Sequence, residues 1–565
     1  MLDSRNFKVG CLLFLFGPHS SFFVLMDILS TPENAREVAE QKQLDELMRA
    51  LGGNSLPPRE PCMKGTRTTI LQEIEDEVNK VDGHDVIWIR GSLGVGKSAL
   101  AASIADRLRV QGRHVIWFRF DRTESTTITT NALWCVVAHD LAHQYPSFRR
   151  QLARGNTEFG SSNIDRLFET LIEKPLSALY HDPHEQLPVI VVDALDECGG
   201  LRHDPTEQKD YDALLRTLRH WAQEDCRKKF RLIITSRPDK HIEQIFPKSI
   251  STHVKIPSGN EVKPGDKPSK DIQAFLESHL SVMDMDKAWV SEARDYLALR
   301  AAGMFIWATT AVQFLQKNPR ERFHILKTRE QERGATIFEE LNSLYSTVVK
   351  TSFGHDTVEE EIKAITSVVG ATIFAKQPLD DTVLTKLPGV DTLEFIRNGL
   401  ASVIDSGPIF RFHHRSFEDF LLSQTFREGF PKLSSIQDRD LHERQLAALC
   451  LNCMISSELH FNTCDLTSSN IKNVDIPATN KPAVSHLISY SCQFWADHLF
   501  RTHAETFTKA VEFVMYEKLL FWIEVMSILG KAHEVSAILK RALEWPRLAV
   551  CPGIISCNAT LRLTG

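Results

Sequence analysis

The feature that most constrains this chain is a glycine-rich segment between an apolar stretch at residues 86–89 and a helical pattern at residues 98–108. It reads Gly91-Ser92-Leu93-Gly94-Val95-Gly96-Lys97-Ser98 and fits the pattern G-x-x-x-x-G-K-[ST]. Glycines let the backbone wrap around phosphate groups, and the loop amides and the helix N-terminus attract negative charge. We therefore predict a nucleotide-binding loop in which Lys97 contacts the outer phosphates and Ser98 ligates Mg²⁺. A chance glycine-rich turn would not need both a strand before it and a helix after it.

Apolar stretches and helical patterns alternate through the first half of the chain in the way that parallel α/β sheets require. Strands are predicted at residues 86–89, 115–120, 189–192 and 232–235. Helices are predicted at residues 98–108, 132–144 and 211–224. Helical patterns then dominate from residue 271 onward. The expected fold is an α/β P-loop NTPase core with a doubly wound, mostly parallel sheet, followed by α-helical domains.

Three carboxylates, Asp193, Asp196 and Glu197, follow the predicted strand at residues 189–192. Ligands of open parallel sheets bind at the carboxyl ends of the strands. We therefore expect Asp193 to hold hydrated Mg²⁺, and Glu197 or Asp196 to polarise the attacking water. A solvated turn after a buried strand is the alternative, but the phosphate-binding loop in the same region favours a catalytic role.

An arginine, Arg237, follows the predicted strand at residues 232–235. A guanidinium group matches phosphate oxygens in a bidentate manner. Arg237 is therefore a candidate for sensing the terminal phosphate, and a surface arginine is the alternative.

The bulk composition excludes several classes of protein. The chain has 66 Lys and Arg against 73 Asp and Glu, so it lacks the basic excess that nucleic-acid binding demands. A chain of 565 residues is too long for a single hydrophobic core, so three or four domains are predicted. Its 11 cysteines are scattered, and the pair Cys450 and Cys453 supplies only two of the four ligands that structural zinc requires. Reduced thiols and a cytoplasmic location are expected.

The first 60 residues contain two apolar stretches, at residues 11–16 and 22–29, separated by a segment with glycine and proline. This interruption disfavours a membrane anchor or a signal peptide. Residues 31–51 have the pattern of an amphipathic helix, and residues 52–58 form a turn-rich break before the nucleotide domain.

These motifs together resemble those of fungal NACHT proteins, which are signal-transduction ATPases with numerous domains (STAND), here of the nephrocystin-3-like N-terminal type. The segments that carry the resemblance are the entry motif at residues 62–67, the phosphate-binding loop, the acidic segment at 193–198, and Thr-Ser-Arg-Pro at 235–238. Residues 301–308 are similar to the helical segment that follows the ATPase core. Residues 414–417 resemble a winged-helix motif whose histidine, His414 in this sequence, touches bound ADP.

The resemblance implies ATP or ADP with Mg²⁺ as ligands and five regions along the chain. These are an N-terminal segment (1–60), a NACHT nucleotide-binding domain (61–257), a helical domain (258–350), a winged-helix-like domain (351–430) and a C-terminal helical region (431–565). By composition alone, the run around His414 is typical of core packing with a solvated face. With the resemblance, a sensing role and structural packing are equally open. Relatives usually carry a long repeat array after the helical region. No repeat of fixed period is visible, so that array is expected to be missing or to lie elsewhere.

The resulting prediction is an ATP/ADP-dependent molecular switch in fungal innate-immunity-like or cell-death signalling. ADP would hold the helical and winged-helix domains closed, and ATP would release them for self-association and for contact with an unknown signalling protein. Arg237 and His414 would make the contacts that differ between the two nucleotides. The alternatives are a constitutive ATP hydrolase with a remodelling role and a truncated nucleotide-binding regulator of a full-length relative. Tightly retained ADP together with very slow ATP hydrolysis would distinguish the switch from these two alternatives.

Overall fold

The computed structural model describes fourteen segments of the chain, listed by residue number: 56–80, 83–121, 130–154, 163–177, 188–198, 205–223, 230–257, 270–328, 337–354, 357–390, 393–466, 484–499, 502 and 504–545. The predicted helix at residues 31–51 and the N-terminal apolar stretches lie outside them. In these segments, no helix has both the length and the apolar character that a membrane crossing requires.

A five-stranded sheet forms the centre of the core, with every neighbouring pair of strands parallel. Its strands are β1 (Val86–Arg90), β2 (Val115–Arg119), β3 (Val189–Asp193), β4 (Arg231–Ser236) and β5 (Ser251–Lys255), in the order β2-β3-β4-β1-β5. The predicted parallel α/β core is thus confirmed, including its four predicted strands. The edge strand β5 was not predicted because only two of its five residues are buried, so it lacks a continuous apolar run.

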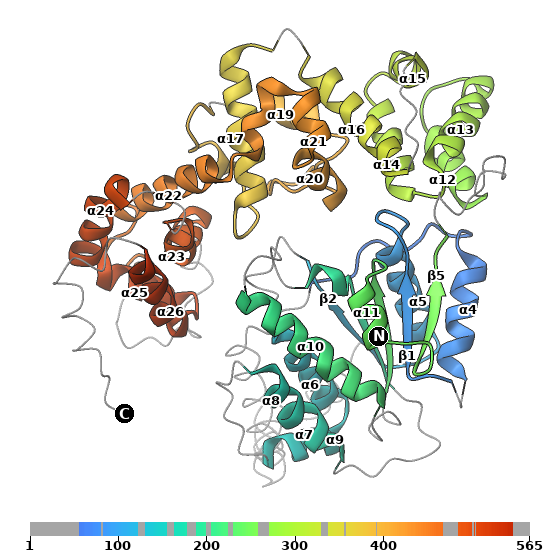
Figure 1. Cartoon of the computed structure of the whole chain (residues 1–565), viewed down its shortest axis with the longest axis horizontal. Coiled ribbons are helices and arrows are strands. Elements are labelled where there is room, and N and C mark those ends of the chain that lie inside the picture. The colour runs from blue at the N-terminus through green and yellow to red at the C-terminus, as the bar shows by residue number, and fades with distance from the viewer. Residues whose placement is uncertain are drawn as a thin grey trace, which may run out of the picture.

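Helices cover both faces of this sheet (Figure 1). They are α4 (Thr68–Asn79), α5 (Lys97–Val110), α6 (Ala132–Gln144), α7 (Pro146–Arg154), α8 (Ile164–Phe168), α9 (Lys174–Ser177), α10 (Pro205–Gln223) and α11 (Lys240–Ile245). Alternate residues of β1 face opposite sides, as a pleated strand requires. Ile87 and Ile89 pack in the cluster of α4 and α5, whereas Val86 and Trp88 pack in the cluster of α6 and α10.

The described residues from 270 onward are mostly helical and arch over the core (Figure 1). Its helices are α12 (Lys270–Leu280), α13 (Lys287–Ala301), α14 (Phe305–Leu315), α15 (Pro319–Thr328), α16 (Ile337–Ser352), α17 (Glu359–Phe374), α18 (Asp381–Leu384), α19 (Glu394–Leu400), α20 (Arg415–Leu421), α21 (Gln424–Gly429), α22 (Arg439–Ile455), α23 (His486–Leu499), α24 (Ala504–Phe513), α25 (Leu519–Ile528) and α26 (Val535–Glu544). One hydrophobic cluster runs through them from Ile272 to Trp545. Cys450 and Cys453 are free, buried thiols on α22, as expected.

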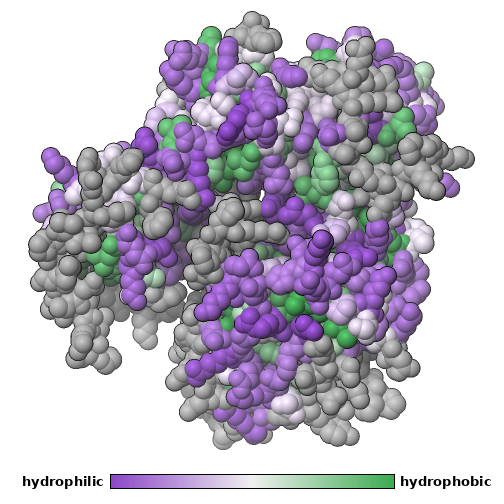
Figure 2. Space-filling view, viewed as in Figure 1, coloured by the Kyte–Doolittle hydropathy of each residue, from purple (hydrophilic) through white to green (hydrophobic). Residues whose placement is uncertain are grey.

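Two isolated antiparallel bridges pair Asp380, just before α18, with Ile409, and Ile404 with Phe412 within the segment between α19 and α20. The winged-helix assignment of residues 351–430 and the domain boundaries stay predictions. The coloured residues in the view of Figure 2 are mostly hydrophilic, and their hydrophobic patches are small and separate. The main cavity, described below, is lined by residues of both the core and the helical region.

Candidate functional site

The glycine-rich segment forms a loop between β1 and α5. Gly94 and Gly96 adopt left-handed backbone conformations, with φ of 75° and 89°, which glycine reaches without a steric penalty. The Lys97 ammonium group donates hydrogen bonds to the carbonyl oxygens of Gly91 (2.9 Å) and Ser92 (3.0 Å). Burial lowers the pKa of Lys97, and the carboxylates of Asp196 and Asp193 oppose that shift. The loop therefore holds its lysine close to the backbone that would surround a phosphate.

Asp193 ends β3 and is fully buried. Its Oδ1 accepts a hydrogen bond of 2.6 Å from the Thr235 hydroxyl, whereas its buried Oδ2 has no hydrogen-bond partner among the described residues. Burial raises the pKa of Asp193, and the hydroxyls of Thr235 and Ser98 counteract this. A buried carboxylate oxygen without a donor, next to a serine hydroxyl, suits a hydrated Mg²⁺ ion. Ser98 and Asp193 therefore fit the predicted metal role.

The backbone after β3 turns sharply at Ala194. This residue has φ 58° and ψ 47°, an uncommon conformation for a residue with a side chain, and its amide donates to the Thr235 hydroxyl at 2.9 Å. Thr235 thus holds both the Asp193 carboxylate and the turn that follows it. The turn leads into a short 3₁₀ helix that contains Asp196 and Glu197. Thr235 was not predicted as a site residue.

Asp196 is paired with Arg237. Its Oδ2 accepts from the Arg237 Nε at 2.6 Å, and its Oδ1 accepts from the Arg237 backbone amide at 3.1 Å. Burial would raise the pKa of Asp196, but the charges of Lys97 and Arg237 outweigh it and hold that pKa below its ordinary value. Both oxygens of Asp196 are therefore engaged, which leaves Glu197 as the better placed of the two to activate water.

Glu197 has a pKa raised to about 7. Burial is the main cause and the negative charges of Asp121 and Asp196 add to it, while Arg415 and Arg59 act in the opposite direction. A carboxyl group whose pKa lies near neutrality can accept a proton and release it again, which suits general acid–base chemistry.

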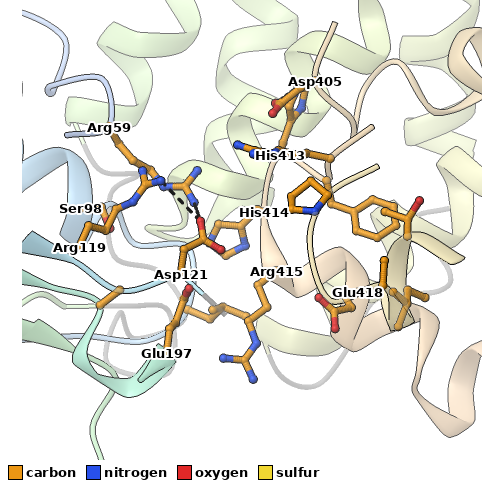
Figure 3. Close-up of a pocket in the computed structure, with 18 of the residues that line it drawn as sticks. Arg59, Ser98, Arg119, Asp121, Glu197, Asp405, His413, His414, Arg415 and Glu418 are labelled. Atoms are coloured by element: carbon orange, nitrogen blue, oxygen red, sulfur yellow. Dashed lines mark ion pairs between the residues drawn. The ribbon is translucent and has the colours of Figure 1, made fainter. Parts of the chain in front are cut away.

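Two arginines that were not singled out from the sequence surround Asp121. Arg59 and Arg119 lie 3.7 Å and 3.5 Å from its carboxylate, and Figure 3 shows the three side chains together near Ser98. Arg119 ends β2 and is in register with Asp193 on β3. Arg119 is the last residue of a buried parallel strand. The rule that ligands bind at the carboxyl ends of parallel strands, which identified Asp193, therefore also applies to Arg119.

His414 comes from the opposite side of the site, where it is the N-cap of α20. Its Nδ1 accepts from the Ser416 backbone amide at 3.1 Å. Burial, followed by the charges of Arg59, Lys97 and Arg237, lowers the pKa of His414 to about 3. The ring is therefore neutral near pH 7 and carries its single proton on Nε2.

A cavity of about 1200 Å³ brings these groups together. The predicted residues that line it are Leu93, Gly94, Gly96, Lys97, Ser98, Asp196, Glu197, Arg237 and His414. The other predicted residues, Gly91, Ser92, Val95 and Asp193, are not on its surface. Thus the structure places His414 across the same cavity as the loop, more than 300 residues away in the sequence.

The phosphate-binding loop also touches the helical region directly. The Ile306 amide at the start of α14 donates to the Gly94 carbonyl at 3.1 Å. A Cβ atom added to Gly94 would lie 2.0 Å from the Ile306 side chain, so only glycine allows this approach. Arg67 donates to the Val95 carbonyl at 3.0 Å and stacks on the Phe305 ring at 5.0 Å.

Comparison with known proteins shows what this chain is similar to. Residues 65–237 match the family described as Nephrocystin 3, N-terminal. The chain is 24% identical over 495 residues to the vegetative incompatibility protein HET-E-1 of Podospora anserina. These two matches support a protein of the NACHT type. The alignment with HET-E-1 covers 80% of this chain and 34% of the relative, so the chain spans about a third of that relative's length.

Two of the similar solved structures come from Pyrococcus species. One is a STAND protein with a tetratricopeptide repeat sensor from Pyrococcus horikoshii, 15% identical with a TM-score of 0.36, covering 88% of this chain and 66% of that chain. The other is a Walker-type ATPase of Pyrococcus abyssi, 12% identical with a TM-score of 0.31, covering 64% of this chain and 98% of that one.

Proposed function

We propose that the chain is an ATP/ADP-dependent molecular switch of the NACHT type. The observation that carries the proposal is the shared cavity, in which a phosphate-binding loop of the core faces His414 of α20. A ligand in this cavity would touch both sides at once. Its phosphates can therefore influence how the helices sit on the core.

On the core side, the loop amides and Lys97 would bind the phosphates, and Ser98 and Asp193 would hold Mg²⁺. When bound, the ion would neutralise part of the phosphate charge. Glu197 would orient the attacking water and accept its proton.

Arg237 would act as the sensor of the terminal phosphate. The Arg237 Nε donates a hydrogen bond to the Asp196 carboxylate. A γ-phosphate would therefore compete with that carboxylate for the guanidinium group. ATP would then loosen a contact that ADP leaves in place.

On the helical side, the neutral His414 would donate its Nε2–H to the diphosphate of ADP. ADP would thereby hold α20 against the core, and ATP would shift the population toward an open form that self-associates. A cytoplasmic location, the winged-helix character of residues 351–430 and contact with a signalling protein belong to this proposal. The name of the Podospora anserina relative supports a role in an incompatibility response.

Identification of the nucleotide that copurifies with the chain tests the proposal. We expect tightly bound ADP, released by denaturation and identified by chromatography, together with very slow hydrolysis of added Mg-ATP. Rapid continuous turnover would favour a constitutive hydrolase, and binding without hydrolysis would favour a truncated regulator. A chain that binds neither ATP nor ADP would refute all three.

A further inference from the structure

A row of hydroxyl groups connects His414 to the helices above the core. The Ser416 Oγ lies 2.8 Å from the His414 Nδ1, and the Tyr345 hydroxyl lies 2.6 Å from that Oγ. Thr310 in turn forms a side-chain hydrogen bond with Tyr345. Ser416, Tyr345 and Thr310 are all buried, so water does not compete strongly for these bonds.

The direction of these bonds follows from the first of them. Because the Ser416 backbone amide donates to the His414 Nδ1, that nitrogen carries no proton and can only accept. A bond between Nδ1 and the Ser416 hydroxyl therefore requires that the hydroxyl donates. The Ser416 oxygen is then free to accept from Tyr345, whose phenol stays protonated because burial raises its pKa.

The same row leads back to the phosphate-binding loop. Thr310 lies one helical turn after Ile306 on α14, and the Ile306 amide binds the Gly94 carbonyl. α16, which carries Tyr345, packs against both α14 and α20. A continuous set of contacts thus joins the loop on one side of the cavity to His414 on the other.

We infer that Tyr345 is a positioning residue for His414, and that it acts through Ser416 to hold the ring with Nε2–H directed at the diphosphate of ADP. Neither Tyr345 nor Ser416 lines the cavity, so neither would touch the nucleotide itself. The inference rests on the proposed nucleotide switch. It adds a link through which movement of α14 or α16 changes the retention of ADP.

A packing role for Tyr345 is the competing explanation, because its ring contacts Phe417 and Phe420 at centroid distances of 5.1 Å and 5.7 Å. Tyr345→Phe separates the two explanations, since it keeps the ring and removes only the hydroxyl. We expect this variant of the full chain to release a fluorescent ADP analogue roughly 2- to 10-fold faster, with ATP affinity little changed.

A double-mutant cycle with His414→Ala supplies the decisive test. If Tyr345 acts through His414, Tyr345→Phe will have no further effect on ADP release once His414 is gone. Tyr296→Phe is the matched control, because that hydroxyl donates to the Leu326 carbonyl at 2.9 Å away from the cavity. We expect the control to leave ADP release unchanged in both backgrounds.

Three results would overturn the inference. An equal effect of Tyr345→Phe with and without His414 would assign Tyr345 to packing alone. An unchanged ADP off-rate in the single Tyr345→Phe variant would show that its hydroxyl does not position the ring. A wild-type chain that binds no ADP would remove the proposed function as well, whereas the first two results leave nucleotide binding intact.

Discussion

The two sides of the cavity are built by different physical means. On the core side, Arg119, Asp193 and Thr235 stand at the ends of three neighbouring parallel strands, and the sheet register alone brings Arg119 beside Asp193. On the helical side, His414 owes its orientation to a helix cap and to hydroxyls from two other helices. The core side is fixed by backbone pairing within one sheet, whereas the helical side depends on side-chain contacts between separate helices. We therefore expect the core side to govern binding and chemistry, and the helical side to govern which nucleotide is retained.

The largest expected effect lies on the core side. Glu197→Gln should slow ATP hydrolysis by about 10²- to 10⁴-fold, because an amide cannot accept the proton of water. Nucleotide affinity should be retained, since the size and shape of the side chain are kept. Single-turnover hydrolysis and equilibrium binding on the same protein measure both quantities. Undiminished hydrolysis would transfer the role to another group, and Asp196→Asn is then the next variant to test.

Lys97→Ala should weaken ATP and ADP binding by roughly 100-fold or more, because it removes a charged donor to the phosphates. Lys240, an exposed lysine at the start of α11, is the matched control, and its replacement by Ala should leave affinity unchanged. Titration with labelled nucleotide compares the two variants. Wild-type affinity in the Lys97 variant would contradict the assignment of the phosphate-binding loop.

On the helical side the expected effect is smaller and selective. His414→Ala should release ADP about 10- to 100-fold faster, the range for a hydrogen bond to a charged group, while ATP affinity changes little. Self-association with ATP should increase, which sedimentation measures. Equal weakening of both nucleotides together with a lower melting temperature would instead identify His414 as a packing residue.

The contact between the two sides can be weakened at Gly94. Gly94→Ala and Gly112→Ala both place a side chain at positive φ, but only at Gly94 would the new Cβ collide with Ile306. The free energy of unfolding without nucleotide should therefore fall by about 1 to 3 kcal/mol more in the Gly94 variant than in the Gly112 control. Equal losses in the two variants would show that the loop does not rest on α14 in solution.

The smallest expected effect is a pH dependence from Glu197, whose pKa is raised from 4.5 to about 7. Below pH 4.5 the carboxyl is protonated in both the folded and the unfolded chain. Between these two values it ionises more readily in the unfolded chain, so the folded state loses stability as the pH rises. The melting temperature of Glu197→Gln should therefore exceed that of the wild type by a margin that grows from pH 4.5 to 7 and then levels off. A constant margin would contradict the raised pKa.

Short-range patterns in the sequence were sufficient for much of the core. Four buried strands were predicted because their apolar residues are consecutive. The loop at residues 91–98 was predicted because its motif is one contiguous stretch of sequence. Asp193 was placed at the sheet edge because all carboxyl ends of parallel strands meet there. The edge strand β5 was missed because a half-exposed strand carries no such apolar run.

The pairing of side chains was decided only by the tertiary structure. Asp196 and Arg237 are 41 residues apart, and nothing in the sequence around either shows that the arginine would occupy the carboxylate. The cluster of Arg59, Arg119 and Asp121 depends in the same way on where separate segments meet. For His414, the motif alone left packing and ligand contact equally open. The hydrogen bond to the Ser416 amide and the position of α20 across from Lys97 make its ring a neutral donor on the cavity wall, because tautomer and burial are set by neighbours that only the folded chain supplies.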